Sequence, residues 1–304
     1  MKRAITLGIG TLALAAMTLP AAAADLGARP ITKAPVAPPA AAFSWSGCYI
    51  GANAGWIHGR ETFALTPSGN YLNPAGVAAP PNAVGTGLLA GDLAAVQHNF
   101  KADDDGFTGG GQVGCNWQAG MLVLGAEADF NGTSLDSTFT RIFAPITSAN
   151  PAFTIGSETE SVTKRLEWFS TVRGRVGFAV DRWLVYGTGG VVFADFKSAT
   201  NVSFAPAGAL PVFDTAVHAG AGSTTRARAV YGGGVEYAFT NNWTAKVEYL
   251  HMDLGTLTYV SPLVSPAGVA PGYSWTTRVS ERNDVVRVGV NYKFDWAVPL
   301  LGRP

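Results

Sequence analysis

The sequence predicts an all-β protein, an eight-stranded antiparallel transmembrane β-barrel with short periplasmic turns and long extracellular loops. Three observations support this fold class. Eight segments alternate residue types with a period of two, which is typical of strands. Only 14% of the residues are charged, against about a quarter in ordinary soluble proteins, so much of the surface must face something other than water. The connections between the segments alternate between very short and long.

The N-terminal region predicts export from the cytoplasm. Lys2 and Arg3 precede an apolar stretch from Ala4 to Leu19, which is followed by Pro20 and then by four consecutive alanines. This pattern predicts a secretory signal peptide over residues 1–24. The alternative is a retained membrane anchor, but the apolar run is shorter than the roughly 20 residues that a spanning helix needs. Residues 25–45 are rich in proline and alanine and predict an extended periplasmic linker.

The barrel is expected over residues 46–294, followed by a C-terminal tail over 295–304. The predicted strands lie at 48–58, 106–117, 121–132, 165–180, 183–196, 226–239, 243–255 and 284–294. Short turns are predicted at 119–120, 181–182 and 240–242, and long loops at 60–105, 133–164, 197–225 and 256–283. All the long loops fall at one end of the sheet. This arrangement is typical of a membrane barrel with its long loops outside the cell.

The alternation within the strands predicts which face meets the lipid. In the last strand Val286, Val288 and Val290 share one face, while Arg287 and Asn291 share the other. A membrane barrel is apolar outside and polar inside, so the valines are expected to face lipid and the charged residues the lumen.

Aromatic residues near the strand ends predict the two interfacial girdles of a membrane barrel, the alternative being ordinary core packing. Those expected near the turns are Tyr49, Trp117, Trp183, Phe239, Trp243, Tyr292 and Phe294, and those expected near the loops are Trp56, Phe107, Phe130, Trp168, Phe196 and Tyr249.

The residues predicted to face the lumen form a balanced set of charges. The negative ones are Glu127, Asp129, Glu236 and Glu248, and the positive ones are Arg173, Arg175, Lys246 and Arg287. Eight strands enclose an interior only wide enough for side chains to fill. Because buried charges persist when they are paired and hydrogen-bonded, we expect a charge network that plugs the lumen.

The two cysteines are predicted to form a disulfide. Cys48 begins the first strand and Cys115 ends the second, so both lie at the periplasmic end of neighbouring strands. Their parity in the two strands places both sulfurs on the outer face. The alternative is two unpaired, small apolar residues.

Several stretches together resemble a known family. They are ADLGARPITKAP, WSGCYIGANAGW, GGGQVGCNWQ, VLGAEADF, RGRVGFAVDRWLVYGTGG, YGGGVEYAFTNNWTAKVEYLHMDLG and VRVGVNYKF. They are similar to the small outer-membrane immunogenic proteins of alphaproteobacteria, OmpA-like barrels often labelled porin-like. The resemblance implies an outer-membrane location, a role in envelope integrity and surface exposure, and no enzyme activity. The chain departs from that pattern in its long first loop and in continuing past Phe294, where such barrels normally end.

Other function classes find little support. The chain has 21 Lys+Arg and 21 Asp+Glu, so it lacks the basic excess of a nucleic-acid-binding protein.

Residues 109–114 match the GxGxxG pattern of nucleotide-binding sites. Such a site needs a helix after the glycines, but here an alternating strand follows, so we interpret the glycines as positions that let the barrel bend. Asp103, Asp104 and Asp105 predict a solvated loop tip rather than a calcium site. We therefore expect no cofactor and no metal.

Two alternatives to a structural barrel remain at this point. One is a small porin with an open lumen. The other is a surface receptor for haem or another ligand, because His58, His98, His218 and His251 all fall at the loop end and imidazole is a good haem or metal ligand. The expected partners are outer-membrane lipid, the outer-membrane assembly machinery, and host molecules or ligands that contact the extracellular loops.

Overall fold

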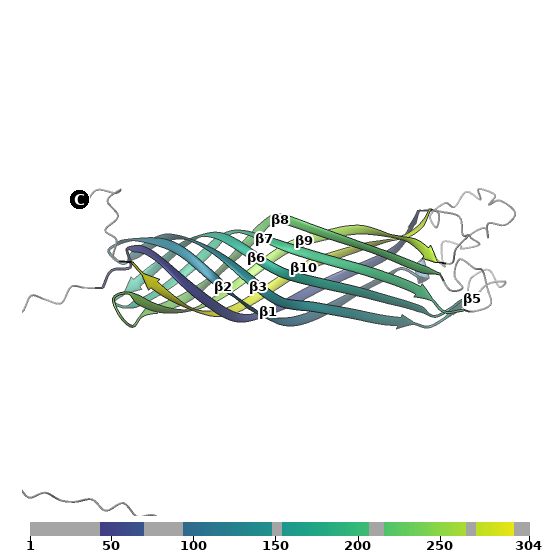
Figure 1. The fold of residues 1–304 in the computed structure, drawn as a ribbon, viewed down its shortest axis with the longest axis horizontal. Helices are drawn as coiled ribbons and strands as arrows, with labels where there is room; N and C mark the ends of the chain where they lie inside the picture. Colours follow the sequence, from purple (N-terminus) through teal and green to yellow (C-terminus); the bar gives the residue numbers. More distant parts are fainter. Residues whose placement is uncertain (1–42, 70–93, 148–153, 207–215, 266–271, 295–304) are drawn as a thin grey trace, which may run out of the picture. The chain divides into compact units, whose positions relative to one another are not determined.

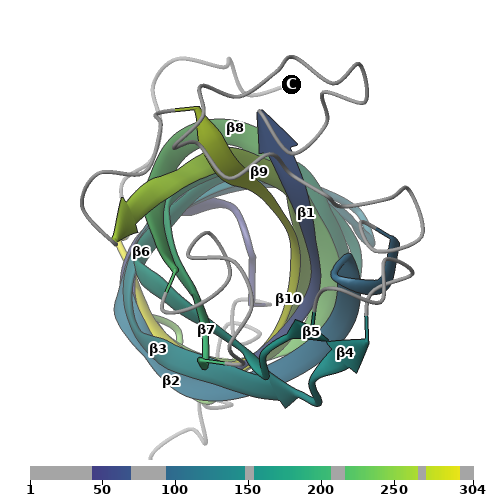
Figure 2. The ribbon, with the colours of Figure 1, turned by 90° about the vertical axis from the view of Figure 1, so that its right-hand side faces the viewer.

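The computed structural model describes residues 43–69, 94–147, 154–206, 216–265 and 272–294. Eight long antiparallel strands close into a barrel in the order β1-β10-β9-β8-β7-β6-β3-β2 (Figures 1 and 2). The predicted fold class is confirmed. The predicted signal peptide, the linker up to residue 42 and the tail after residue 294 lie outside the described residues, and their boundaries stay predictions. Within the described ranges no helix is long and apolar enough to cross a membrane.

The barrel strands are β1 (Gly47–Gly69), β2 (His98–Ala119), β3 (Leu122–Phe143), β6 (Glu158–Val180), β7 (Trp183–Phe204), β8 (Val217–Ala238), β9 (Trp243–Ser265) and β10 (Tyr273–Lys293). A small separate sheet pairs β4 (Ile146–Thr147) with β5 (Thr154–Ile155) at the end opposite the short turns (Figure 2). The three short turns lie where they were predicted, between β2 and β3, β6 and β7, and β8 and β9.

The strands are much longer than predicted, so the extent of the predicted loops is wrong. The first predicted loop, 60–105, contains the last residues of β1 and the first residues of β2, which pair up to Leu65↔His98. A strand of 22 residues, such as β2, rises about 3.3 Å per residue and, at a tilt of about 40°, spans about 55 Å. The apolar band of an outer-membrane barrel is about 25 Å tall. The loop half of this barrel therefore extends beyond the membrane.

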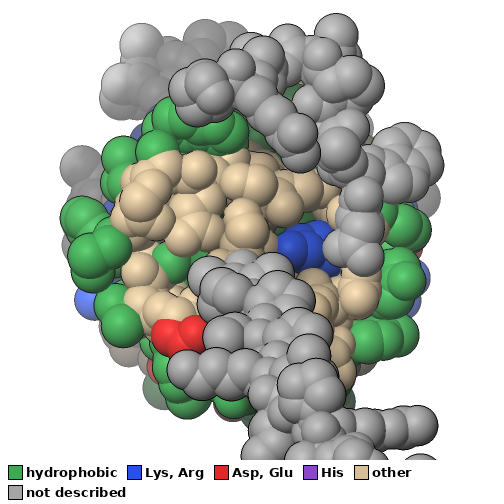
Figure 3. Space-filling model, turned by 90° about the vertical axis from the view of Figure 1, so that its left-hand side faces the viewer, with side chains coloured by type: hydrophobic (Ala, Val, Ile, Leu, Met, Phe, Trp, Pro, Cys, Tyr) green, Lys and Arg blue, Asp and Glu red, His purple; other side chains and the backbone are tan. Residues whose placement is uncertain are grey.

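The outer surface of the turn half is apolar. We call it the apolar belt, and its exposed members include Ile50, Trp56, Phe107, Val113, Phe130, Val172, Val176, Phe178, Val185, Val235, Val247, Tyr249, Val286, Val288 and Val290. Figure 3, which views the turn end, shows hydrophobic side chains around the rim of the barrel. The apolar belt includes valines more than half exposed, such as Val288 at 58%, which is the pattern expected of a surface covered by lipid.

A polar collar follows directly above the apolar belt on the outer face. It contains His58, Arg60, Asp103, Asp105, Arg165, Glu167, Asp195, Lys197, His251, Asp253, Arg282 and Asp284. Many of these residues are paired around the collar, including His58 with Asp105 at 2.8 Å and Lys197 with Glu167 at 3.1 Å. The change from apolar to charged residues marks the outer boundary of the membrane-spanning segments.

The predicted aromatic girdles need two corrections. Most of the predicted members are exposed near the expected boundaries, among them Trp117 and Trp183 at the turns and Trp56 and Phe107 below the collar. Tyr49, however, is only 4% exposed and points into the barrel, where its hydroxyl donates to Glu127 at 2.7 Å. Phe196 is 3% exposed and packs in the interior. Both lie on the inward parity of their strands, which the grouping of aromatics by height ignored.

Candidate functional site

The interior of the barrel is the candidate site, and side chains fill it in successive layers. Near the turns lies an apolar layer made by Trp45, Val123, Ala179, Leu184, Tyr186 and Ala238. The layer of predicted lumen charges follows. A second apolar layer contains Ile57, Leu135, Leu166, Phe169, Val192, Leu250, Met252 and Val285. A cluster around Lys164 lies above it, and a third apolar layer, with Phe63, Phe100, Phe196 and Trp275, lies toward the loop end.

The apolar layer near the turns contains residues from the predicted linker. Trp45 is 2% exposed, and its backbone N–H donates to the Gln118 side chain at 2.7 Å. The Phe43 ring packs edge-on against Trp45 at 5.1 Å, and the Lys293 ammonium lies 4.6 Å from the Phe43 ring centre. Residues 43–46 therefore fold against the periplasmic mouth of the barrel, although the sequence suggested that the linker continues to residue 45.

All eight predicted lumen residues come together in one buried network. Arg173 is its centre, because its guanidinium lies 2.6 Å from Glu127, 2.9 Å from Asp129 and 3.1 Å from Glu248. Glu127 and Arg173 are direct partners in the β3–β6 register, and Glu248 and Arg287 in the β9–β10 register. Charge-assisted hydrogen bonds of this kind are about twice as strong as those between neutral groups.

The remaining cations complete the pairing. Arg287 contacts Asp129 at 2.8 Å and Glu248 at 2.5 Å, and the Lys246 ammonium lies 2.8 Å from Glu127. Arg175 donates to Glu236 at 2.7 Å. The eight charged side chains are at most 5% exposed. The network therefore holds four cations and four carboxylates with almost no access to water.

Neutral polar residues that the sequence analysis missed satisfy the rest of the network. Arg175 donates to the Tyr49 oxygen at 2.9 Å, and the Tyr186 hydroxyl donates to Glu248 at 2.9 Å. Thr171 donates to Asp129 at 2.8 Å, and Asn291 donates to Glu236 at 2.8 Å. Each of these residues lies on the inward parity of its strand, so parity was the signal that could have identified them.

A second charged cluster occupies the interior above the apolar belt. The Lys164 ammonium contacts Glu61 and lies 3.0 Å from both Asp104 and Glu281. Asp104 is only 7% exposed, so the prediction of a solvated loop tip at 103–105 is wrong for this residue. Asp104 lies on strand β2 and faces inward. Burial raises the pKa of Glu61 to about 8, the neighbouring Lys164 ammonium opposing the shift.

The two cysteines lie opposite each other at the turn end. Cys48 pairs with Cys115 in the β1–β2 register, and their sulfurs form a disulfide with an S–S distance of 2.06 Å.

The four histidines lie on strands rather than in loops, because the strands extend beyond the predicted boundaries. His58 and His251 belong to the collar on the outer face, where His251 lies 2.7 Å from Asp284. His218 is buried inside the barrel, with its ring 6.2 Å from that of Trp275. His98 lies beside Glu160. The histidines proposed for a haem or ligand receptor are thus divided between the two faces of the wall.

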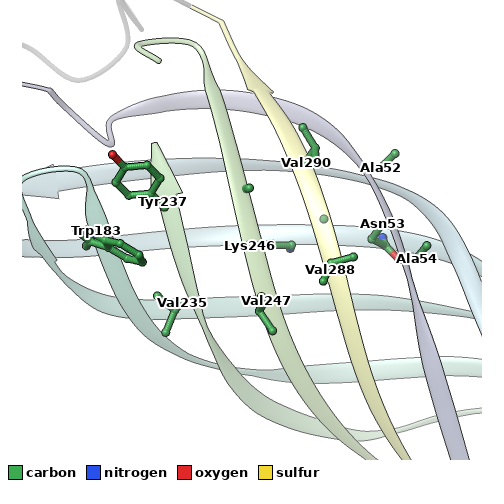
Figure 4. A pocket seen from close by; sticks show the side chains of 12 residues that line it. Ala52, Asn53, Ala54, Trp183, Val235, Tyr237, Lys246, Val247, Val288 and Val290 are labelled. Atoms are coloured by element: carbon green, nitrogen blue, oxygen red, sulfur yellow. The ribbon is translucent and has the colours of Figure 1, made fainter. Parts of the chain in front are cut away.

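An apolar groove of about 690 Å³ lies on the outer surface (Figure 4). Ala52 and Ala54 of β1 lie at one side of it and Trp183 and Tyr237 of β7 and β8 at the other, with valines of β9 and β10 between them. The groove lies on the apolar belt, so it belongs to the surface that contacts membrane lipid.

Comparison with known proteins agrees with this architecture. The family model described as outer membrane protein beta-barrel domain matches residues 9–294. The chain is 35% identical over 263 residues to the 31 kDa outer-membrane immunogenic protein of Brucella melitensis, a match covering 86% of this chain and 88% of the relative. It is 28% identical to a 22 kDa outer membrane protein of Rhizobium leguminosarum over 53% of this chain and 60% of the relative.

Among solved structures, the outer membrane protease OmpT of Escherichia coli is similar at 10% identity and a TM-score of 0.41, covering 83% of this chain and 98% of that chain. The family match over most of the chain, together with the closed barrel and its apolar belt, places the protein in the outer membrane. The chain belongs to the outer membrane β-barrel protein family.

Proposed function

We propose that this protein is a structural, non-enzymatic outer-membrane barrel with a closed lumen, which supports the integrity of the envelope and exposes its loop end at the cell surface. The observation that carries the proposal is the filled interior. A network of balanced charge lies between apolar layers, and residues from several strands meet across the barrel axis in each of them.

The composition of the interior favours a plug over a pore. An ion channel would carry a ring of one charge sign in a wide lumen. Here each carboxylate of the lumen network contacts at least one cation, and eight strands leave room only for side chains. The same burial argues against catalysis by this network, because Glu127 and Glu248 are 3% and 1% exposed and no substrate reaches them.

The closed lumen predicts the electrical behaviour of the purified protein. In a planar bilayer the wild-type barrel is expected to give no long-lived conductance steps. A 16-stranded porin reconstituted in the same way serves as the positive control. A Trp45→Ala variant, which opens only the layer nearest the turns, is expected to stay silent because the layers above it remain filled. Large, stable, voltage-insensitive steps from the wild type would instead favour the alternative of a small porin.

The role in envelope integrity predicts a phenotype for cells that lack the protein. Deletion of the gene is expected to raise uptake of a hydrophobic dye and sensitivity to SDS, since a closed, filled barrel would be missing from the membrane. Expression of the wild-type protein from a plasmid should restore both readouts. Equal dye uptake by the deletion and parent strains would contradict the role in envelope integrity. The closed lumen is tested separately by the conductance measurement.

A further inference from the structure

A cluster of three metal-ligating side chains lies inside the loop end of the barrel, far above the lumen network. His98 begins strand β2, and Glu158 and Glu160 begin strand β6. The His98 Nδ1 atom lies 3.1 Å from a carboxylate oxygen of Glu160 and 3.7 Å from one of Glu158. One ligand atom from each residue falls within 4.8 Å of the other two.

The two glutamates are buried with a single hydrogen bond for their four oxygens, the one between His98 and Glu160. Glu158 is 2% exposed and Glu160 is fully buried. Neither oxygen of Glu158 has a hydrogen-bond partner, and the second oxygen of Glu160 has none either. Leaving such groups unpaired in a protein interior is costly. Among the described residues no lysine or arginine forms an ion pair with either glutamate, because Arg141, the register partner of Glu160, lies over the Phe100 ring instead. The side chain of Glu158 points at the same space as His98 and Glu160.

The spacing of the three ligand atoms fits a small metal ion. Zinc binds histidine nitrogen at about 2.0 to 2.1 Å and carboxylate oxygen at about 2.0 to 2.2 Å, in tetrahedral geometry. Two ligands at those distances and at the tetrahedral angle lie about 3.4 Å apart. The observed separations of 3.1 and 3.7 Å lie on either side of that value. We propose that His98, Glu158 and Glu160 bind a divalent transition-metal ion of the Zn²⁺ type, with solvent or a further ligand completing its coordination.

The surroundings hold the ligands in place and select the class of ion. The His98 ring stacks face to face on Phe143, with ring centres 3.5 Å apart and planes 2° apart, which fixes the direction of Nδ1. Imidazole with carboxylate suits zinc and its neighbours, whereas calcium prefers six to eight oxygens. Two carboxylates also balance the charge of a divalent ion.

Such an ion would link β2 to β6, which are separated in the barrel by β3. The β2–β3 pairing runs from Thr108↔Thr133 to Ala119↔Leu122, near the turns. Toward the loop end β2 pairs with β1, while β3 pairs with β6. Arg141 of β3 reaches across to β2, where its guanidinium lies 4.8 Å from the Phe100 ring centre. A metal ion held by His98 and the two glutamates would fasten β2 to β6 where β2 and β3 do not pair, and it would stabilise the surface-exposed end.

The test uses the untagged, refolded full-length mature protein, stripped with EDTA and titrated with Zn²⁺ by calorimetry. Co²⁺, whose visible absorption reports tetrahedral nitrogen and oxygen ligands, is used in parallel. The variants are His98→Ala and Glu160→Gln, and the matched control is His58→Ala, which removes a histidine from the outer collar. Migration in SDS before and after boiling shows that each variant is folded.

We expect the wild type and His58→Ala to bind one equivalent of Zn²⁺ and to unfold at a higher temperature when it is present. His98→Ala and Glu160→Gln are each expected to lose at least about 100-fold in affinity, since removal of even a supporting partner of a ligand costs 10- to 100-fold. Glu160→Gln removes a buried charge, so its folding should not suffer. The proposal is overturned if the wild type takes up no Zn²⁺, or if both ligand variants bind it as the wild type does.

Discussion

Replacing Arg173 by alanine is expected to destabilise the barrel by about 3 to 5 kcal/mol, the cost of removing one partner from a buried ion pair. Arg173 contacts Glu127, Asp129 and Glu248 within 3.1 Å, and its side chain is fully buried. The variant leaves these three carboxylates with Lys246 and Arg287 as close cations, and with Arg175 at 3.8 Å from Glu127. The resulting excess of buried negative charge is the source of the loss.

The measurement is the free energy of unfolding in urea, followed by tryptophan fluorescence and by the fraction that keeps its unboiled mobility in SDS. Arg165→Ala is the matched control. Arg165 pairs with Asp136 at 2.6 Å on the outer face, but its side chain is 53% exposed, so the expected loss is below about 1 kcal/mol. An Arg173→Ala barrel as stable as the control would show that water reaches the network, and it would weaken the proposal of a closed lumen.

The lumen network was predictable because the membrane imposes a simple alternation. In the turn half of β10, Val286 and Val288 face lipid while Arg287 faces the lumen, and the same pattern recurs in β3, β6 and β9. Parity therefore identified the eight inward charges. It did not reveal which of them meet, because contacts across the axis depend on register and on side-chain length. Lys246, for example, is the direct register partner of Glu236 but its ammonium lies 2.8 Å from Glu127.

The loop half of the barrel was missed because its alternation is inverted. Along β1 the outward residues change from Ala54 and Trp56 to His58 and Arg60, while Ile57 and Phe63 point inward. Outside the membrane the wall must be polar toward water and apolar toward its core, as in a soluble barrel. A prediction that looks for strands with apolar residues on the outer face ends each strand at this boundary. It therefore assigns the rest of the strand to a loop.

Because the predicted strands ended too early, the sequence analysis missed both the cluster around Lys164 and the cluster of His98 with the two glutamates. Lys164, Asp104 and Glu160 fall in segments assigned to loops, where charged residues are usually solvated. Extending β2 with the same parity turns Asp104 inward. Lys164 and Glu160 face inward for a further reason, because a bulge between Leu166 and Phe169 shifts the register of β6 and exchanges its inward and outward positions. Trp45 was missed for a different reason. It follows a proline-rich stretch, and its packing against Leu184 and Ala238 depends on tertiary contacts that no local pattern reports.

Removal of the disulfide is expected to produce the other large loss of stability. Cys48 and Cys115 are 67 residues apart in the sequence, and they join β1 and β2 at the turn end. In the chain-entropy model, closing a loop of that length stabilises the folded protein by about 4 kcal/mol, because the unfolded chain loses freedom. The periplasm is oxidising enough to keep the bond formed.

The double variant Cys48→Ala/Cys115→Ala is therefore expected to unfold at a lower urea concentration than the wild type, by up to about 4 kcal/mol in free energy. When urea unfolding is repeated with reductant present, the free energy of unfolding of the wild type should fall to that of the double variant. The free energy of unfolding of the double variant should not change. Thiol labelling of the unreduced, denatured wild type should find no reactive cysteine. Two reactive cysteines in that sample, or equal stability of wild type and double variant, would contradict the prediction. The alanines themselves cost little, since both positions lie on the outer face and a small apolar side chain suits contact with lipid.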